Sequence, residues 1–336
     1  MDVDENTYLC TMNQQLYPRI YTHTENLPEM DNRQFFHSRQ LFEMCEQTKG
    51  HTPYMITVES AEGKVVAHLL AVVRYRSSWF PPYFYLHCRM LGEGVYEEGY
   101  VQTELFELML STLKEKISRR LLYIEISNIS QKMFGYKELR RLGFFPVRWM
   151  NIYNSLHSRT PEERISKKML RRITVSYERG AVTKEVEIAA EEKALTRLLK
   201  QHNFLKPKRF IPDPSFFHKL HESGNGKLFV TKYKDHVIGC AVCVCSGGNA
   251  FLWYTAFRRK SYVRLHPDLL TVWHAIQYAY KNGYQHINFM DVGLPYRKNS
   301  YADFILSFGG KPVSTYRWFY FPFGWLNRIL SSLYNI

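Results

Sequence analysis

An aspartate that closes an apolar run is the first residue in this sequence whose position suggests chemistry. Residues 287–292 read I-N-F-M-D-V, a composition typical of a buried strand, and Gly293 follows directly. Open α/β sheets place their ligands at the carboxyl ends of such strands. Asp291 is therefore a candidate general base or substrate anchor, and the alternative is that its carboxylate caps a turn.

Tyrosines on either side of Asp291 in the chain add proton carriers or hydroxyl donors. We take Tyr254 and Tyr301 as catalytic candidates together with Asp291, because a phenol can donate a hydrogen bond or move a proton. A glycine, a tyrosine and two cations follow the predicted strand, and we expect them to contact the substrate together with one arginine from an earlier basic segment. The predicted substrate contacts are Gly293, Tyr296, Arg297, Lys298 and Arg172.

A basic loop precedes the helix that leads to this aspartate. Pro267 stands where a first helical turn tolerates proline, apolar residues recur at helical spacing, and Gly283 follows as a stop. Helix N-termini attract anions, so cations ahead of this helix could bind phosphate groups, although a solvated loop would have the same composition. His266 either caps the helix or joins the anion site. The candidate anion ligands are Arg258, Arg259, Lys260, Arg264 and His266.

The pattern around Asp291 occurs twice. Subtracting 166 places Asp291 on Glu125 and lays the helix at 267–282 over residues 101–116. The same subtraction pairs Gly309 with Gly143, Pro312 with Pro146 and Val313 with Val147. Repetition of one order of helix, strand, helix and strand predicts a tandem duplication of one domain.

The duplication predicts two α/β domains with mixed sheets, at 1–159 and 160–321, each large enough to bury a core. The tetrapeptide T-P-E-E that begins at Thr160 is typical of a helix start, so we expect a basic helix at 161–179 to connect the domains. Residues 322–336 combine aromatics with a short amphipathic helix. We expect this helix to pack back on the N-terminal domain, and a lipid interface is the alternative.

The composition favours a cytoplasmic protein with anionic partners. The 336 residues carry a formal net charge of +14, which points to nucleic acid, anionic lipid or phosphorylated ligands. The acidic start M-D-V-D-E-N does not read as a signal peptide, and no apolar run is long enough to span a membrane. Cys240, Cys243 and Cys245 lack metal-binding spacing and are interpreted as buried thiols, so we expect no metal site.

The segment from Pro267 to Pro312 resembles a motif of the FemABX peptidyltransferase group. That motif reads roughly P-N-x-L-L-x-W-x-A-I-x-x-A-x-x-x-G, then an acidic residue with glycines, then R-F-K-x-x-F-G-G-x-P. The order of elements resembles the Gcn5-related N-acetyltransferase (GNAT) fold over nearly the whole chain. The lysine of R-F-K is replaced by Ile305, and a helical hairpin used by some members for transfer RNA is missing. The matching residues are Pro267, Leu269, Leu270, Trp273, Ala275, Ile276, Ala279, Gly283, Asp291, Gly293, Phe304, Phe308, Gly309, Gly310 and Pro312.

The resemblance implies transfer of an acyl or aminoacyl group from acyl-CoA or aminoacyl-tRNA to an amine, with no tightly bound cofactor. The acceptor amine would belong to a cell-wall precursor, a lipid or a sugar, in cell-envelope or lipid biosynthesis. Acetyltransferases of this fold usually hold the carrier's pyrophosphate on a glycine-rich loop before the long helix, and residues 258–266 contain no glycine. Two alternatives remain: a tandem GNAT protein that binds without catalysis, and an RNA-binding protein. Contact with an anionic membrane at its inner face fits the same charge.

Overall fold

Two units make up the chain in the computed structural model, which describes residues 15–78, 82–203, 210–295 and 299–334. The first unit combines residues 1–149 with residues 315–336, and the second comprises residues 150–314. No helix within the described ranges is long and apolar enough to cross a bilayer.

The first unit begins with antiparallel strands and continues into a helix, strand, helix and strand. Its sheet runs β1-β2-β3-β4-β6, antiparallel except for the parallel pair β4 and β6. Short 3-10 turns lie at 24–26, 35–37 and 118–120. The elements are β1 (Leu16–Tyr21), α1 (Arg39–Glu46), β2 (His51–Ser60), β3 (Val65–Ser78), β4 (Tyr83–Leu91), β5 (Val95–Tyr96), α2 (Gln102–Ile117), β6 (Tyr123–Ser127), α3 (Tyr136–Arg141) and the start of β7 (Phe145–Ser155).

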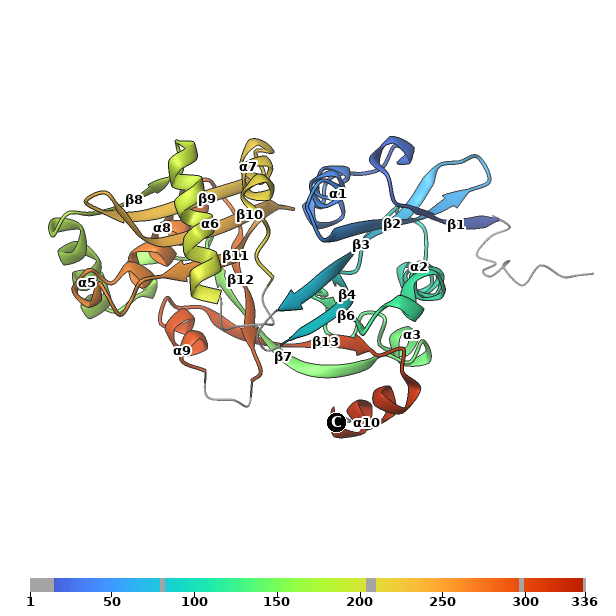
Figure 1. Ribbon diagram of the computed structural model, residues 1–336. Coiled ribbons are helices and arrows are strands. Elements are labelled where there is room, and N and C mark those ends of the chain that lie inside the picture. Colours follow the sequence, from blue (N-terminus) through green and yellow to red (C-terminus); the bar gives the residue numbers. More distant parts are fainter. Residues whose placement is uncertain (1–14, 79–81, 204–209, 296–298, 335–336) are drawn as a thin grey trace, which may run out of the picture. The chain divides into compact units, whose positions relative to one another are not determined.

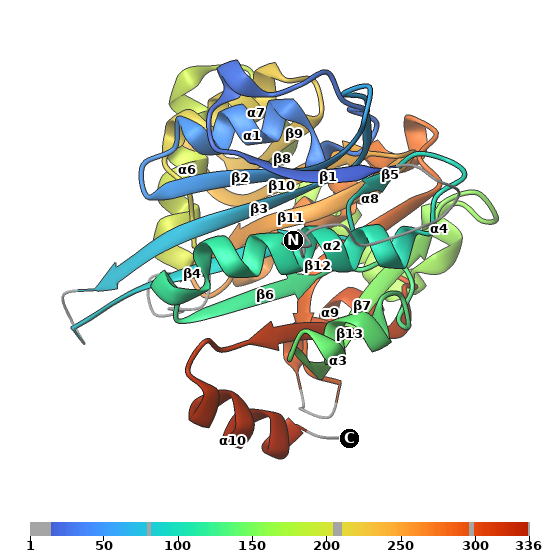
Figure 2. The same cartoon turned by 90° about the vertical axis from the view of Figure 1, so that its right-hand side faces the viewer.

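Helix α2 supplies most of the core of the first unit. It packs against β1, β2 and β3 (Figure 2). Phe106, Met109, Leu110 and Leu113 recur at helical spacing and are buried against the apolar side of the sheet. Trp318, from the far end of the sequence, is fully buried in the same cluster. The unit is therefore completed by residues of the C-terminal segment.

The second unit repeats this order of elements (Figure 1). Its sheet runs β8-β9-β10-β11-β12, antiparallel except for the parallel pair β11 and β12. The elements are α4 (Pro161–Arg164), α5 (Lys167–Glu178), β8 (Ala181–Glu185), α6 (Ala189–Asn203), α7 (Pro214–Glu222), β9 (Gly226–Tyr233), β10 (His236–Ser246), β11 (Asn249–Phe257), a 3-10 turn (Val263–Leu265), α8 (Pro267–Lys281), β12 (His286–Gly293), α9 (Ser300–Leu306) and β13 (Lys311–Tyr320), and α10 (Gly324–Tyr334) follows in the first unit.

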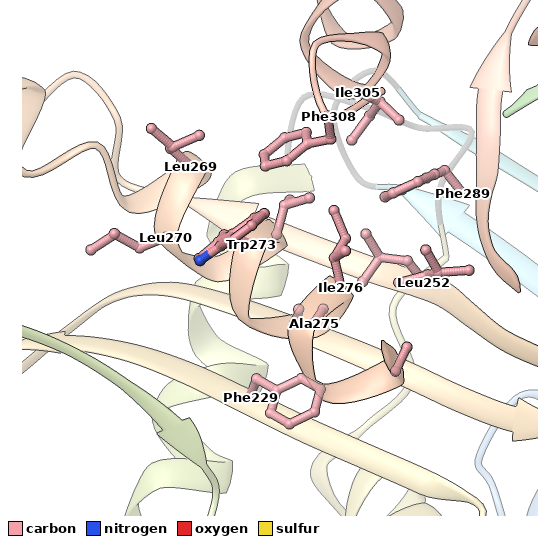
Figure 3. Close-up of a cluster of buried hydrophobic side chains, with 14 of the residues drawn as sticks. Phe229, Leu252, Leu269, Leu270, Trp273, Ala275, Ile276, Phe289, Ile305 and Phe308 are labelled. Carbon is pink, nitrogen blue, oxygen red and sulfur yellow. The ribbon is translucent and has the colours of Figure 1, made fainter. Parts of the chain in front are cut away.

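Helices cover both faces of the second sheet. On one face, α8 and α9 bury Trp273, Ile276, Ile305 and Phe308 against the strands, together with residues of α5 (Figure 3). On the other face, α6 and α7 pack against β9, β10 and β11. Helix α8 starts with Pro267 and ends at Lys281, and Gly283 follows just past the end with a φ of +74°, so the predicted start and stop are confirmed.

The two halves of the sequence exchange their last strands. Residues 150–155 of β7 pair with β12 of the second unit, and residues 318–320 of β13 pair with β6 of the first unit. The units therefore divide at 149/150 and 314/315, whereas the sequence suggested 159/160 and 321/322. Local patterns mark where strands lie but not which half they join, because pairing partners are distant in sequence.

The connecting segment differs from the single helix expected at 161–179. The predicted helix start at Thr160 is confirmed, and it forms a capping box in which the Thr160 hydroxyl accepts from the Glu163 amide and the Glu163 carboxylate accepts from the Thr160 amide. Helix α4 then stops at Arg164, and Ser166 caps a separate helix α5 by accepting from the Met169 amide at 3.2 Å. A second N-cap inside the basic run causes this break.

The internal repeat is visible in equivalent elements. Strands β4 and β11 start at Tyr83 and Asn249 and end at Leu91 and Phe257, so both ends differ by 166 (249 − 83 and 257 − 91). Gly143 and Gly309 each follow a short helix in the left-handed conformation, with φ of +85° and +83°. The sequence shift thus pairs residues with the same structural role.

Candidate functional site

Strands β11 and β12 form a fork in the second unit. Their parallel pairing runs from Asn249 with His286 to Leu252 with Phe289 and ends there. Both strands continue past the last pair, β11 as far as Phe257 and β12 as far as Gly293. A fork between parallel strands at their carboxyl ends is a position where α/β proteins accept a ligand.

A β-bulge lies at the branch point of the fork. On β10, Val242 and Cys243 are adjacent but face Tyr254 and Leu252, so Trp253 is an extra residue on β11. Consistent with this bulge, consecutive rings reach the same helix: Trp253 lies 5.9 Å from Phe216 and Tyr254 lies 5.6 Å from Phe217. Tyr254 is only 4% exposed, so its ring belongs to the packed layer under α7. Its catalytic role remains a prediction. The buried ring leaves little of the phenol accessible to a substrate.

Asp291 lies two residues past the last pair on β12 and has an uncommon backbone conformation. Its φ is +59°, a region that aspartate enters more readily than most residues. The register advances by two residues on β7, from Ile152 to Met150, while it advances by four on β12, from Phe289 to Gly293, so β12 also bulges here. The side chain is half-buried. Residues in sparsely populated backbone conformations cluster at functional sites.

Asn299 fastens the end of β12 to the start of α9. Its side-chain oxygen accepts from the Tyr301 amide at 3.0 Å, and its amide group donates to the Val292 carbonyl at 2.5 Å. A Cβ on Gly293 would lie 2.8 Å from this amide nitrogen, and Gly293 has a φ of +127°, so only glycine fits. Tyr301 is half-buried in the first turn of α9. Asn299 therefore links the Asp291 strand to the helix that carries Tyr301.

Helix α9 packs against both strands of the fork. The Phe304 ring lies 6.5 Å from that of Phe257 at the end of β11 and 5.3 Å from that of Phe308. Ile305, where the FemABX motif has lysine, is fully buried against Phe289 (Figure 3). The position that would carry a cation in that motif is thus part of the core.

The glycine pair after α9 serves close packing. A Cβ on Gly309 would lie 2.7 Å from Cβ of Arg164, and a Cβ on Gly310 would lie 2.4 Å from the side-chain oxygen of Asn154. The Asn154 amide group also donates to the Phe308 carbonyl at 3.0 Å. The F-G-G motif therefore holds α4 and β7 against the end of α9.

The basic loop before α8 is exposed, and its cations have local partners. Arg259 forms an ion pair with Asp268 at 3.3 Å, and Arg258 contacts the Gln201 side chain at 3.4 Å. The Arg264 carbonyl accepts from the guanidinium of Arg179, the residue after α5, at 2.8 Å. Lys260 is exposed on the same loop. Loop and α5 thus form one basic surface beside the α8 N-terminus.

His266 is the N-cap residue of α8, as one of the two interpretations had it, but its side chain does not cap the helix. It occupies the N-cap position in the left-handed conformation, with φ of +43° and no side-chain capping hydrogen bond. The carboxylate of Asp268 lies in the first helical turn instead. Burial and then the nearby Arg172 guanidinium lower the pKa of His266, so the imidazole is mainly neutral near pH 7. Arg172 itself is exposed on α5.

The remaining predicted substrate contacts, Tyr296, Arg297 and Lys298, lie outside the described residues. Of the others, Asp291, Gly293 and Tyr301 come together around the fork. The anion candidates form a separate group at the α8 N-terminus. Trp253 and Asn299 were missing from the predicted site. The Asn299-Ser-Tyr start of a helix was a readable signal for one, whereas no local pattern marks the Trp253 bulge.

Glu125, the counterpart of Asp291, has a different environment in the first unit. It is 7% exposed, pairs with Arg317 at 3.0 Å and lies 3.4 Å from Arg89. The Arg317 guanidinium stacks 3.8 Å above the ring of Trp149. Strands β4 and β6 stay paired to the last residue of each, Leu91 with Ser127. The first unit therefore has no fork at this place, and its carboxylate is held in a buried ion-pair network.

Comparisons with known proteins agree with this architecture. Residues 166–298 match the family model "Acetyltransferase (GNAT) domain". Among solved structures, FemX is similar with a TM-score of 0.59 and 15% identity, covering 92% of this chain and 96% of FemX. A tandem GNAT protein from the clavulanic acid biosynthesis pathway has a TM-score of 0.57 and 9% identity, covering 89% and 91%. L-PGS from Bacillus licheniformis has a TM-score of 0.57 and 10% identity, covering 89% and 92%. No curated protein matches the sequence.

The chain therefore has a FemABX-like tandem GNAT fold, and the family match lies in the second unit. At these identities the structural neighbours establish the fold alone. The GNAT match supports a transferase of the acyltransferase class.

Proposed function

We propose that the second unit transfers an acyl or aminoacyl group from a carrier to an amine at the fork between β11 and β12. The observation that carries this proposal is the bulge at Trp253 where the parallel pairing ends, inside the segment that matches the GNAT domain. The fork gives an extended acyl carrier a place between two strands, and Asp291 and Tyr301 lie near its end.

The chemistry needs positioned groups and no covalent enzyme intermediate. An ammonium acceptor is attracted to the Asp291 carboxylate and gives up a proton, and the neutral amine then attacks the acyl carbonyl. The new C–N bond forms as the carrier's thiol or hydroxyl leaves, and that leaving group takes a proton. We assign the Tyr301 phenol to give this proton and to recover one from the nitrogen of the new C–N bond, and a hydrogen-bond donor at the developing oxyanion lowers the barrier further.

The carrier is acyl-CoA or aminoacyl-tRNA, and both bring phosphate groups. Exposed cations at the α8 N-terminus and on α5 are the proposed contacts for these phosphates, because the loop offers charge in place of glycine amides. These cations are Arg172, Arg258, Arg259, Lys260 and Arg264, and the half-buried imidazole of His266, mainly neutral near pH 7, is the proposed uncharged contact beside them.

Mass spectrometry of acceptors tests the proposal directly. The full chain is incubated with acyl-CoA in one arm and charged transfer RNA in another, each with a panel of amine acceptors. We expect one acceptor to gain the acyl or aminoacyl mass in one arm only, which also assigns the donor class. Absence of mass gain and of carrier binding in both arms would overturn the proposal.

A second candidate is a tandem GNAT protein that binds a carrier without turnover. The buried Ile305 at the motif's lysine position favours it. This candidate predicts saturable carrier binding in native mass spectra with no modified acceptor. The transferase proposed above predicts carrier binding and a modified acceptor.

A further inference from the structure

Helix α10 leaves a large part of its apolar surface uncovered. The side that it turns towards the first unit is mixed: the Asn327 amide group donates to the Gly143 carbonyl at 3.0 Å and its side-chain oxygen accepts from the Phe321 amide at 3.0 Å, Leu326 and Leu330 are half-buried, and the Tyr334 ring lies 6.3 Å from that of Phe145. None of its eleven residues is buried. Helices of globular proteins normally turn the apolar side towards the core. Both views show α10 at the edge of this unit, beyond β13 (Figures 1 and 2).

The apolar side of α10 is exposed in a continuous stripe. Trp325, Ile329 and Leu333 follow each other at four-residue intervals and are 68%, 53% and 72% exposed. Phe323, just before the helix, is 52% exposed. Apolar patches of this kind mark interaction surfaces, and a tryptophan with aliphatic neighbours suits the boundary between lipid headgroups and acyl chains.

A cationic pocket lies on the other side of the same helix. Its volume is about 340 Å³, and it is lined by two arginines, two serines, an asparagine and two residues of the turn after α3. None of these residues is acidic, and α10 has no acidic residue in its first turn. The lining residues are Arg140, Gly143, Phe144, Asn327, Arg328, Ser331 and Ser332. Guanidinium and hydroxyl groups together are suited to a phosphate diester.

We propose that α10 docks this protein on a bilayer surface that contains anionic phospholipid. Trp325, Ile329 and Leu333 enter the headgroup–acyl boundary, and a headgroup phosphate occupies the pocket between Arg140 and Arg328. Charge complementarity selects this occupant, because the pocket is cationic and the whole chain carries +14. A second copy of the chain fits less well: the stripe from Trp325 to Leu333 is only about 12 Å long, and a two-fold contact would bring like-charged pockets close together. This proposal stands apart from the transfer reaction.

Vesicle co-sedimentation tests the docking. We expect the full chain to bind phosphatidylcholine vesicles that contain phosphatidylglycerol, and to bind pure phosphatidylcholine more weakly. The triple variant Trp325→Ser, Ile329→Ser, Leu333→Ser should lose about tenfold in partitioning for each side chain that reaches the acyl boundary. These side chains are exposed, so the fold should persist, and circular dichroism and the melting temperature verify this. Val182→Ser, at an exposed valine of the second unit, is the matched control and should bind like wild type.

Charge variants test the pocket separately. Arg140→Gln and Arg328→Gln should each lower binding to the anionic vesicles about fivefold and lower binding to phosphatidylcholine less, because choline neutralises the charge of the headgroup phosphate there. Arg197→Gln, an exposed arginine on α6, is the control for net charge alone. If Arg197→Gln weakens binding as much as either pocket variant, the pocket assignment is overturned.

Two further results would overturn the docking. One is equal binding of the wild type and the triple variant to anionic vesicles. The other is a wild-type dimer that the triple variant converts to a monomer without any vesicle binding, which would make the second copy the occupant. Quenching of tryptophan fluorescence by brominated lipid, lost in Trp325→Phe, is the expected supporting result.

Discussion

The two units have the same order of elements but treat the strand after their long helix in opposite ways. In the first unit, β4 and β6 stay paired to their last residues, and Glu125 is buried between Arg89 and Arg317. In the second unit, pairing stops at Leu252 and Phe289, and Asp291 lies beyond the branch in a left-handed conformation. A single-residue bulge at Trp253 accompanies the opened end, while β4 has continuous register with β3. A duplicated fold can thus keep one copy as a closed scaffold and leave an opening in the other.

The loops before the long helices also differ between the units, in their charge. Residues 92–101 of the first unit contain Glu93, Glu97 and Glu98 and no cation. Residues 258–266 of the second unit contain four lysines or arginines and no acid. A helix N-terminus behind a cationic loop attracts phosphate, whereas one behind an acidic loop does not. Fork and charge therefore favour the same unit for a phosphorylated carrier.

The largest expected difference between the units is in their stability at acidic pH. His37, His51, His68 and His87, all in the first unit, have pKa values lowered by burial to about 3, 2, 4 and 3. Each stays neutral when folded but takes up a proton when unfolded, so its stabilising effect is lost as pH falls below the unfolded pKa near 6.5. Below that pH, each histidine lowers the free energy of unfolding by up to about 1.4 kcal/mol per pH unit. The four together lower it by up to about 5 kcal/mol per pH unit.

Hydrogen-exchange mass spectrometry at pH 7.5 and pH 5.5, corrected for intrinsic rates, measures this. We expect β2, β3 and β4 to lose protection before β9, β10 and β11. His51→Gln should reduce the pH dependence of the free energy of unfolding by the equivalent of about one bound proton. His23→Gln, at an exposed histidine, should leave this pH dependence unchanged. Simultaneous loss in both units would mean that the buried histidines do not set the acid stability.

Asp291→Asn tests the open carboxylate. Loss of a general base lowers turnover about a hundred- to ten-thousand-fold, which is roughly 3 to 5 kcal/mol of barrier. Asparagine also enters the left-handed region, so the free energy of unfolding should change by less than about 1 kcal/mol. Asp303→Asn, at an exposed aspartate of α9, is the control and should keep wild-type turnover. Wild-type turnover in Asp291→Asn at saturating acceptor would make Asp291 a structural residue.

Glu125→Gln tests the closed carboxylate. Two guanidinium groups would lose their buried counter-charge, so the free energy of unfolding should fall by about 3 kcal/mol while turnover per folded molecule stays unchanged. Glu107→Gln removes a more exposed pair with Arg141 and should cost less than about 1 kcal/mol. Urea denaturation and an activity assay at low denaturant measure both. A drop in turnover greater than the loss of folded protein would place Glu125 in the chemistry.

Much of this fold was predictable from local pattern, and the fork was not. The 3.6-residue period located α2 and α8, the capping box located α4, and the shift of 166 matched Gly143 with Gly309. Each of these signals lies within one element or its caps, where sequence acts directly on backbone geometry. Ser166, which starts α5, was a similar local signal that the basic run concealed.

Features that depend on distant segments escaped the sequence. The exchange of β7 and β13, the end of pairing at Leu252 and the Arg317–Glu125 ion pair all join residues far apart in the chain. Strand composition is almost the same in a paired and a parted strand, because both are apolar and buried. Asp291 and Glu125 were aligned correctly as members of equivalent strands, but their environments are set by neighbours that no local pattern names.

The smallest expected effect concerns the cationic loop, and salt dependence makes it measurable. Lys260→Gln with Arg264→Gln removes two exposed charges beside the α8 N-terminus, each worth about 1 kcal/mol or less at the surface. If they contact carrier phosphates, affinity should fall several-fold, and the slope of log K against log salt should flatten by about 1.4 to 1.8. Lys193→Gln with Arg197→Gln removes equal charge from α6, on the other face of the sheet, and should leave the slope nearly unchanged. If the salt slope flattens equally in both double variants, carrier binding depends on net charge alone, and the loop is not the phosphate site.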